Sequence, residues 1–336
     1  MKTKICITGS SGFIGFHLAK KLLDKGFKVH GFDSMNNYYD INLKKSRLNI
    51  LKKYKNFFFT KGNLENKNII NKSIISFKPK IIIHLAAQAG VRYSIDNPEA
   101  YLQSNIVGTF NIIQIAKKIN VKHLIIASSS SVYGANKKIP FREIDKTDHQ
   151  VSFYAATKKS TESLAHAYSA LWKLPITMLR FFTVYGPWGR PDMAYFKFTK
   201  NIIDGKKINI YNKGKMYRDY TYIDDVIDGM YKLLYKFPKL KQKKTFSNDS
   251  LSPVAPFRIL NIGNTKKVHL LDFICTLEKE LGKKAIKNEM PMQKGDVHLT
   301  LSNSRLLKEI INYNPNTSYR FAIKKFINWY KSYYKK

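Results

Sequence analysis

The segment YAATK contains a tyrosine and a lysine, Tyr154 and Lys158, whose types and spacing suit acid–base chemistry. The apolar periodicity predicts a helix near 152–172, and residues four apart share one face of a helix. An ammonium on that face favours the phenolate, and a tyrosine with a lowered pKa can deprotonate a hydroxyl group near neutral pH. The sequence therefore predicts Tyr154 as a general base. Because Tyr-x-x-x-Lys also occurs on many structural helices, this prediction depends on the other motifs.

A second chemical motif lies near the N-terminus, where ITGSSGFIG places Gly9, Gly12 and Gly15 after a predicted strand and at the start of a predicted helix. Gly9 permits a tight turn, Gly12 lets the backbone approach a pyrophosphate, and Gly15 lets the helix pack closely on the strand. The N-terminus of the helix offers unpaired N–H groups to the anion. The motif predicts a dinucleotide site; three glycines that form only a turn are the alternative.

An acid at the end of the second predicted strand, Asp33, supports the dinucleotide interpretation. Its carboxylate can accept both ribose hydroxyls of an adenosine and would repel a 2′-phosphate, and the next residues, Ser34 and Met35, supply no arginine to pair with one. The predicted cofactor is therefore NAD, whose positive nicotinamide would also favour the Tyr154 phenolate. Asn63, after the third strand, could pair with the adenine edge, or could simply form a turn.

The elements that must position these groups follow from the hydrophobic pattern. Short apolar runs alternate with segments of helical period, which is typical of βαβ units. The fold class is α/β, a Rossmann-type doubly wound parallel sheet with a smaller C-terminal α/β substrate-binding region. The predicted strands are Lys4–Thr8, Lys28–Asp33, Phe57–Thr60, Lys80–Leu85, Leu124–Ala127 and Ile176–Arg180. The predicted helices between them lie near 13–25, 40–53, 65–76, 98–119 and 152–172.

The pattern loosens after about Gly186, where glycines and prolines separate shorter elements. We therefore expect an NAD-binding domain over 1–185 and a smaller region over 186–336, between which the chain can cross back. Further helices are predicted at 224–236, 269–282 and 318–334, and the polar stretch 242–256 is expected to be a surface loop.

Composition limits the class of protein. With 336 residues, of which 44% are hydrophobic, the chain has ample core material for a folded protein. No apolar run reaches the roughly 18 residues that span a bilayer, and no secretory signal is present, so a cytoplasmic location without membrane contact is expected. The two cysteines, Cys6 and Cys275, are far apart and have no metal-ligand spacing, which argues against a disulfide scaffold or a metal site.

The net charge of +36 is unusual and leaves a different class open, a nucleic-acid-binding protein on a dinucleotide fold. The lysines, however, are spread along the whole chain, with only short clusters such as 240–244 and the C-terminus. This spread favours a solvated basic surface over a specific nucleic-acid face. A positive field would also attract anionic small substrates.

Six motifs together carry a specific resemblance. They are GSSGFIG, HLAAQAGVRYS, SSSSVYG, YAATK, RFFTVYGPWGRPDM and RDYTYIDDV. The set resembles the extended short-chain dehydrogenase/reductase family of nucleotide-sugar enzymes (the NAD-dependent epimerase/dehydratase family) and, within it, the UDP-glucuronate 4-epimerases. The resemblance runs from about residue 3 to 264, with weaker matching to 297. It implies reversible C4 epimerisation of UDP-glucuronate to UDP-galacturonate through a 4-keto sugar, with tightly bound NAD. It also implies that the smaller region over 186–336 binds the nucleotide sugar.

The resemblance also implies residue roles. Ser129 takes the place of the family's catalytic Ser/Thr and joins Tyr154 and Lys158. The implied cofactor-binding residues are Gly9, Gly12, Phe13, Ile14, Gly15, Asp33, Asn63, Leu64, Leu85, Ala86, Ala87, Asn105, Tyr154 and Lys158. The implied substrate-binding residues are Arg92, Ser129, Ser130, Ser131, Thr183, Arg190, Tyr211, Arg218 and Asp296. Of these, Ser130, Ser131, Thr183 and Arg190 match the group that holds the sugar's carboxylate. Family members are commonly homodimers through the helices matching 98–119 and 152–172.

Family enzymes with related activities differ in the residues that lie between the positions of Ser129 and Tyr133. The family's 4,6-dehydratases have an Asp-Glu pair there and its UDP-glucuronate decarboxylases a glutamate, whereas this chain has Ser130, Ser131 and Val132. Gln293 stands where the galactose-type epimerases have an arginine, and Thr183 stands where they have an asparagine. Through the resemblance, both departures argue against a neutral hexose as the preferred substrate. Asn63 stands where the family usually has Asp. A 4-epimerase of another UDP-hexose, N-acetylated or neutral, and, less favoured, a decarboxylase stay open as alternatives.

Overall fold

The computed structural model describes residues 3–240, 244, 248–293 and 295–336. Its main sheet has seven parallel strands in the order β10-β6-β5-β4-β1-β2-β3. The strands are β1 (Lys4–Thr8), β2 (Lys28–Asp33), β3 (Phe57–Lys61), β4 (Ile81–His84), β5 (His123–Ser129), β6 (Ile176–Phe181) and β10 (Phe257–Ile262). The order reverses direction between β1 and β4, and such a switch point is where open α/β sheets bind ligands.

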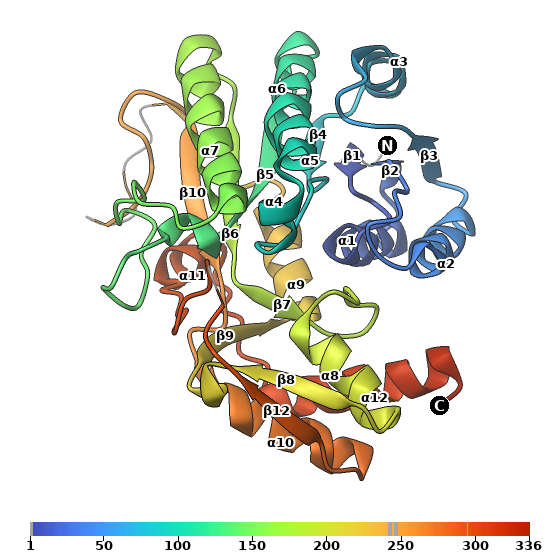
Figure 1. The fold of residues 1–336 in the computed structure, drawn as a ribbon. Coiled ribbons are helices and arrows are strands. Elements are labelled where there is room, and N and C mark those ends of the chain that lie inside the picture. The colour runs from blue at the N-terminus through green and yellow to red at the C-terminus, as the bar shows by residue number, and fades with distance from the viewer. Residues whose placement is uncertain (1–2, 241–243, 245–247, 294) are drawn as a thin grey trace.

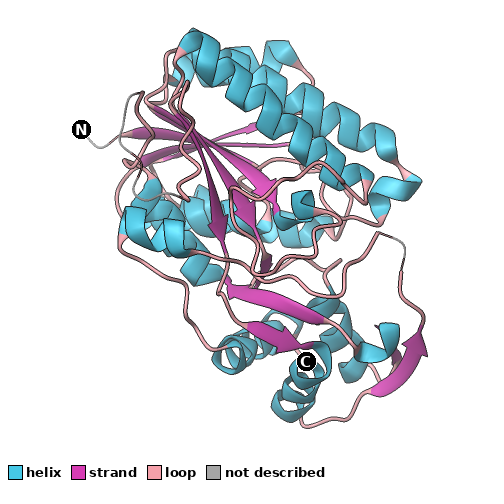
Figure 2. Cartoon of the chain, turned by 90° about the vertical axis from the view of Figure 1, so that its left-hand side faces the viewer, coloured by secondary structure: helices cyan, strands magenta, loops and turns pink. Residues whose placement is uncertain are grey.

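Helices cover both faces of this sheet (Figures 1 and 2). One face packs against α3 (Lys67–Phe77), α6 (Gly108–Lys118) and α7 (Phe153–Trp172), and the other lies against α1 (Phe13–Asp24), α2 (Ile41–Lys52) and α9 (Ile223–Leu233). The strands alternate accordingly, because Ile5 and Ile7 lie in one core and Cys6 in the other. The predicted doubly wound sheet is confirmed, with β1 and β2 at the predicted bounds.

One predicted helix is interrupted. Residues 98–119 form α5 (Pro98–Tyr101), a π-helical segment η1 (Leu102–Val107) and α6, rather than one regular helix. A short helix, α4 (Tyr93–Asp96), precedes them. A π-helical turn holds more residues per turn than an α-helix, so it rotates the residues that follow. Hydrophobic periodicity alone did not reveal this change.

The smaller region lies beyond the carboxyl ends of the large sheet (Figure 1). It has a three-stranded sheet in the order β11-β9-β7 and a two-stranded sheet of β12 and β8. Its elements are β7 (Thr183–Tyr185), α8 (Ala194–Ile203), β8 (Lys207–Tyr211), β9 (Tyr217–Tyr222), β11 (Lys267–His269), α10 (Leu270–Leu281), β12 (Ile286–Met290), α11 (Arg305–Ile311) and α12 (Tyr319–Tyr334). Short 3-10 turns, η2 (Ser130–Tyr133) and η3 (Asn212–Gly214), follow β5 and β8.

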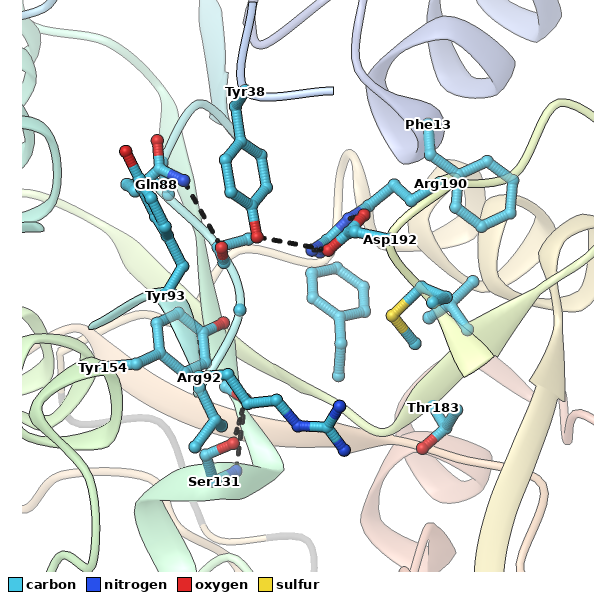
Figure 3. Close-up of a pocket in the computed structure, with 18 of the residues that line it drawn as sticks. Phe13, Tyr38, Gln88, Arg92, Tyr93, Ser131, Tyr154, Thr183, Arg190 and Asp192 are labelled. Carbon is cyan, nitrogen blue, oxygen red and sulfur yellow. Dashed lines mark hydrogen bonds and ion pairs between the residues drawn. The ribbon is translucent and has the colours of Figure 1, made fainter. Parts of the chain in front are cut away.

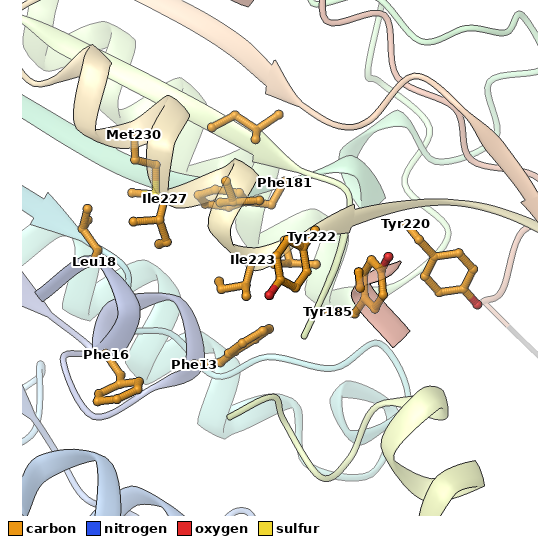
Figure 4. Close-up of a cluster of buried hydrophobic side chains, with 14 of the residues drawn as sticks. Phe13, Phe16, Leu18, Phe181, Tyr185, Tyr220, Tyr222, Ile223, Ile227 and Met230 are labelled. Carbon is orange, nitrogen blue, oxygen red and sulfur yellow. The ribbon is translucent and has the colours of Figure 1, made fainter. Parts of the chain in front are cut away.

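The chain crosses back between the two regions. Both β10 and α9 come from residues beyond 186, yet β10 pairs with β6 and α9 packs near α1. One core joins the regions, because Phe13 and Leu18 of α1, Ile227 of α9 and Tyr185 of β7 belong to the same buried cluster (Figure 4). The division at 185/186 stays a prediction. The loop predicted over 242–256 and the cluster at 240–244 include residues 241–243 and 245–247, which lie outside the described residues.

Candidate active site

A cavity of about 1220 Å³ lies at the carboxyl ends of the large sheet, between that sheet and the smaller region. Its lining includes Tyr154 and Lys158, the N-terminal glycines and Asp33. It also includes the other predicted site residues except Asn105, and these are Phe13, Ile14, Asn63, Leu64, Leu85, Ala86, Ala87, Arg92, Ser129, Ser130, Ser131, Thr183, Arg190, Tyr211, Arg218 and Asp296. The fold thus brings together residues from nearly the whole length of the chain. Their individual roles stay predictions.

The glycine loop is packed so closely that side chains are excluded. A Cβ atom on Gly15 would lie 2.0 Å from the carbonyl oxygen of Gly9, and one on Gly9 would lie 2.8 Å from the amide nitrogen of Ala86. Gly9 also has a positive φ of 75°, which favours glycine. Gly12 is the N-cap of α1 and provides no side-chain cap, so the first N–H groups of the helix keep their capacity for an anion.

The Asp33 carboxylate lies at the end of β2 beside this loop. Its Oδ2 accepts from the amide of Ser11 (2.9 Å) and its Oδ1 from the amide of Met35 (2.9 Å). Among the residues that the structure describes, the buried hydroxyls of Ser10 and Ser11 have no hydrogen-bond partner. A fixed carboxylate, two unpartnered hydroxyls and a loop without side chains fit the ribose and pyrophosphate of a dinucleotide.

Asn105, which the resemblance implied helps to seat the cofactor, does not itself line the cavity. It is fully buried in the π-helical segment, where its amide accepts from the backbone N–H of Gln88 (2.8 Å) and donates to the Gln88 carbonyl (3.1 Å). It also donates to the hydroxyl of Thr157 (3.0 Å) on α7. Asn105 therefore holds the loop after β4, which does line the cavity, against the helix that carries Tyr154.

Tyr154 and Ser129 both line the cavity, but the pKa of Tyr154 differs from the prediction. Burial raises the pKa of Tyr154, while a hydrogen bond with the Ser129 hydroxyl and the positive charge of Arg190 lower it by less. The net pKa therefore lies above the usual value. The cation identified as lowering this pKa is Arg190, whereas the sequence had pointed to the Lys158 ammonium.

Lys158 lies one helical turn farther along α7, 5% exposed, and its Nζ donates to the Ala127 carbonyl of β5 (2.9 Å). Burial lowers the pKa of Lys158 to about 8, although the negative charge of Glu162 opposes this shift. Glu162 is itself bonded to Ser128 (2.6 Å) and to Arg180 (2.8 Å). The catalytic helix and the end of β5 are thus joined by a buried charged network.

Arg190 lies opposite Tyr154, across the cavity, with Thr183 below it (Figure 3). Its guanidinium forms a two-point pair with Asp192, at 3.0 Å from Nε to Oδ1 and 2.5 Å from Nη2 to Oδ2. The phenol of Tyr38 donates to the same carboxylate (3.3 Å). Neither Tyr38 nor Asp192 was predicted as a site residue, although Tyr38 lies five residues after Asp33 and Asp192 lies within the motif RFFTVYGPWGRPDM.

The far end of the cavity is made by the smaller region and by α4. The Arg92 guanidinium lies over the ring of Tyr211 at 4.7 Å, and Arg218 pairs with Asp296 at 2.7 Å. These four predicted substrate residues thus contact one another in pairs. Arg47, which the sequence motifs did not single out, is fully buried and donates to the carbonyls of Ser11 (3.0 Å) and Gly189 (3.0 Å). It ties the glycine loop to the loop that carries Arg190.

Residues 5–247 match the model of the NAD dependent epimerase/dehydratase family. The chain belongs to this family. It is 47% identical over 332 residues to a probable UDP-glucuronate 4-epimerase of Rhizobium meliloti, covering 98% of this chain and 97% of that protein. It is 44% identical to UDP-glucuronate 4-epimerase 4 of Arabidopsis thaliana, over 98% of this chain and 76% of that protein.

A solved structure of a family member supports the same placement. The UDP-glucuronic acid 4-epimerase of Bacillus cereus, in complex with UDP-glucuronic acid and NAD, superposes with a TM-score of 0.84 at 30% identity, over 98% of this chain and all of that one. Membership of the NAD dependent epimerase/dehydratase family confirms the predicted enzyme class and NAD as the cofactor. The comparisons thus support an enzyme rather than the alternative class of nucleic-acid-binding proteins.

Two further findings concern the residues that the structure describes. None of their helices combines the length and the apolar character needed to cross a bilayer. Their histidines, cysteines and carboxylates form no group of three or more that could hold a metal ion.

Proposed function

We propose that this chain interconverts UDP-glucuronate and UDP-galacturonate by inverting C4 of the sugar. The observation that carries the proposal is the arrangement of one cavity, whose lining includes the glycine loop, Tyr154 hydrogen-bonded to Ser129, and the Arg190 side chain, whose charge acts on Tyr154. The relatives from Rhizobium meliloti and Arabidopsis thaliana and the Bacillus cereus structure, whose names give the same activity, support it.

In this proposal, different residues bind the cofactor, bind the sugar and transfer the proton. The glycine loop and Asp33 hold the dinucleotide, and the Ser129 hydroxyl bonds the sugar O4. When bound, NAD supplies a hydride acceptor for C4 and a positive charge that adds to that of Arg190. The Tyr154 oxygen takes the O4 proton and later returns it. Because the hydride taken from C4 would also be returned, to the opposite face of the ketone, the net redox change is zero. Between the two transfers the 4-keto sugar turns about its diphosphate link and presents its other face.

A 4-keto uronic acid is a β-keto acid and can lose CO₂. Loss of CO₂ requires the breaking bond to overlap the carbonyl π system, so a carboxylate held in the ring plane is protected. Ser130, Ser131, Thr183 and Arg190 would hold the carboxylate in this way, since all four line the cavity near Tyr154. The cavity has no acidic residue at 130–132 to promote another reaction of the ketone.

The test follows the sugar signals by NMR while the purified protein is incubated with UDP-glucuronate. UDP-galacturonate is expected, and starting from UDP-galacturonate should give the same final ratio. UDP-pentose with released CO₂ as the main product would overturn the proposal in favour of a decarboxylase. UDP-glucose and UDP-N-acetylglucosamine are tested for comparison. If either is epimerised faster than UDP-glucuronate, a UDP-hexose without the carboxylate is the natural substrate.

We also propose a homodimer and a cytoplasmic location. Apolar side chains on or beside the helices at 98–118 and 153–172 are exposed, including Leu102 (38%), Leu171 (69%) and Trp172 (44%). Helices with such a surface pair readily, since association buries it. Light scattering coupled to gel filtration should give twice the chain mass of 39.0 kDa. A monomer at micromolar concentration would contradict the dimer.

A further inference from the structure

The guanidinium of Arg190 is already paired inside the cavity. Asp192, two residues along the same loop, binds it through both carboxylate oxygens, and the two side chains are only 23% and 21% exposed. Burial opposes ionisation of Asp192, but the Arg190 charge more than offsets it and holds the pKa of Asp192 below its usual range. Arg190 therefore carries a neutralising partner at the pH where the enzyme works.

A third group fixes this pair from across the cavity. Tyr38, in the loop after β2, donates its phenol to Oδ2 of Asp192 and packs on the ring of Tyr93 at 4.9 Å. Burial, followed by the negative charge of Asp192, raises the pKa of Tyr38 to about 12, so the phenol stays a donor. Figure 3 shows Tyr38 and Arg190 on either side of the Asp192 carboxylate. Asp192 cannot turn away without losing both partners.

The consequence concerns how firmly the sugar's carboxylate is held. A charge-assisted guanidinium pair in a partly buried site is strong. An unshared Arg190 would therefore bind the substrate carboxylate tightly. Asp192 competes for the same guanidinium and weakens this hold, while leaving enough donors to recognise an anion. An interaction slows the reaction when it stabilises the bound ground state more than the state in which the 4-keto sugar rotates about its diphosphate link.

We propose that Asp192 is a positioning residue that shares the charge of Arg190, so that the uronic acid is recognised yet released for each turn of the 4-keto sugar. This inference rests on the proposed function, because only an epimerase must let its sugar rotate within the site. Tyr38 supports the arrangement by keeping Asp192 in place. Lys44 and Lys197, which also contribute charge at Asp192, act on it less strongly than Arg190.

The decisive variant is Asp192→Asn, which keeps the shape and one acceptor but removes the charge. The Kd and KM for UDP-glucuronate should fall about tenfold and kcat should fall by about the same factor, corresponding to about 1.4 kcal/mol. The deuterium isotope effect measured with substrate labelled at C4 should move toward one, because turning then limits the rate. The Kd for UDP-glucose, which has no carboxylate, should stay unchanged.

Two controls separate this role from a structural one. In an Arg190→Ala background, Asp192→Asn should leave the Kd for UDP-glucuronate unchanged, because the guanidinium it acts through is gone. Asp145→Asn removes a comparable carboxylate, paired with Arg142 at 3.2 Å outside the cavity, and should change none of these quantities. If Asp192→Asn does not fold, Tyr38→Phe is used instead. Without the phenol that keeps it in place, Asp192 should share the charge of Arg190 less, and the Kd for UDP-glucuronate should fall about threefold.

The inference is overturned if Asp192→Asn weakens UDP-glucuronate binding, leaves Kd and kcat unchanged, or shifts the Kd of UDP-glucose equally. A failure of the proposed function gives a different result, since wild-type protein would then form no UDP-galacturonate at all. In that case the two Kd values still test whether Asp192 tunes the recognition of a carboxylate.

Discussion

The two ends of the cavity are built in different ways. At the cofactor end, Gly9, Gly15 and Asp33 come from one βαβ unit and act through backbone fit and backbone hydrogen bonds. At the sugar end, the contacts are between charged or aromatic side chains from distant segments, such as Arg218 with Asp296. A backbone cradle is rigid and suits a cofactor that stays bound. Paired side chains can exchange partners, which suits a substrate that must enter, turn and leave.

The largest effect is expected for Tyr154→Phe, which alters the residue where the two ends of the cavity meet. Loss of the proton-transfer group should lower the epimerisation rate about 10³-fold, measured by NMR. The NAD content after denaturation should stay that of the wild type, since the backbone cradle is intact. Tyr235→Phe, which alters a 57% exposed ring bonded to Thr3, is the matched control and should keep the full rate. A Tyr154→Phe enzyme with normal turnover would show that another base carries the proton.

Arg190→Ala tests the sugar end by itself. The KM for UDP-glucuronate should rise about 10- to 100-fold, because a charged hydrogen-bonding partner is lost. Part of the turnover should appear as UDP-pentose and CO₂, since the carboxylate is less well held in the ring plane. Product ratios by NMR check both effects. Arg142→Ala, outside the cavity, should alter neither, and an Arg190→Ala enzyme with an unchanged KM would remove Arg190 from the binding site.

Gly15→Ala tests the cofactor end. The added methyl group would lie 2.0 Å from the Gly9 carbonyl oxygen, so helix α1 must shift. We expect the purified protein to lose its bound NAD and its free energy of unfolding to fall by about 1–3 kcal/mol. The control is Gly229→Ala in α9, where the nearest neighbour would be at 3.8 Å. If Gly15→Ala retains NAD, the cradle is less rigid than the comparison requires.

The smallest effect concerns Lys158. Its pKa of about 8 in the folded protein lies below its ordinary value of 10.5, so between these pH values the folded state binds fewer protons than the unfolded state. Its contribution to stability therefore rises from pH 8 to 10, by on the order of 1–2 kcal/mol. Denaturant titrations of wild type and Lys158→Met at both pH values should differ by this amount. Parallel pH curves would contradict the shifted pKa.

The sequence predicted the cofactor end well, because its signals are local. The glycine spacing, the strand before it and Asp33 all lie within 33 residues, and the short apolar runs located β1 to β6. The strand β10 was missed, since its partner β6 lies about 80 residues away in the chain and no pattern within one segment reveals that pairing. The π-helical segment was missed for a related reason, because hydrophobic periodicity cannot distinguish it from an α-helix.

At the sugar end, the resemblance supplied the residues but not their partners. Arg190 and Asp296 lie in the cavity as implied, yet their pairing with Asp192 and Arg218 depends on loop geometry that residue types do not contain. The raised pKa of Tyr154 was also missed, because burial depends on the packing of both regions around it. The ion pairs of this site and the pKa of Tyr154 could therefore be found only from the folded structure.

The shared core of α1, α9 and β7 has a practical consequence for dissecting this protein (Figure 4). A fragment that stops at residue 185 would lack α9 and β10, leaving apolar side chains of α1 and the edge of β6 open to water. Such a fragment should aggregate, whereas the whole chain should melt in a single transition. We therefore expect the regions before and after residue 185 to fold as one unit, so that neither can be replaced by the corresponding region of another protein.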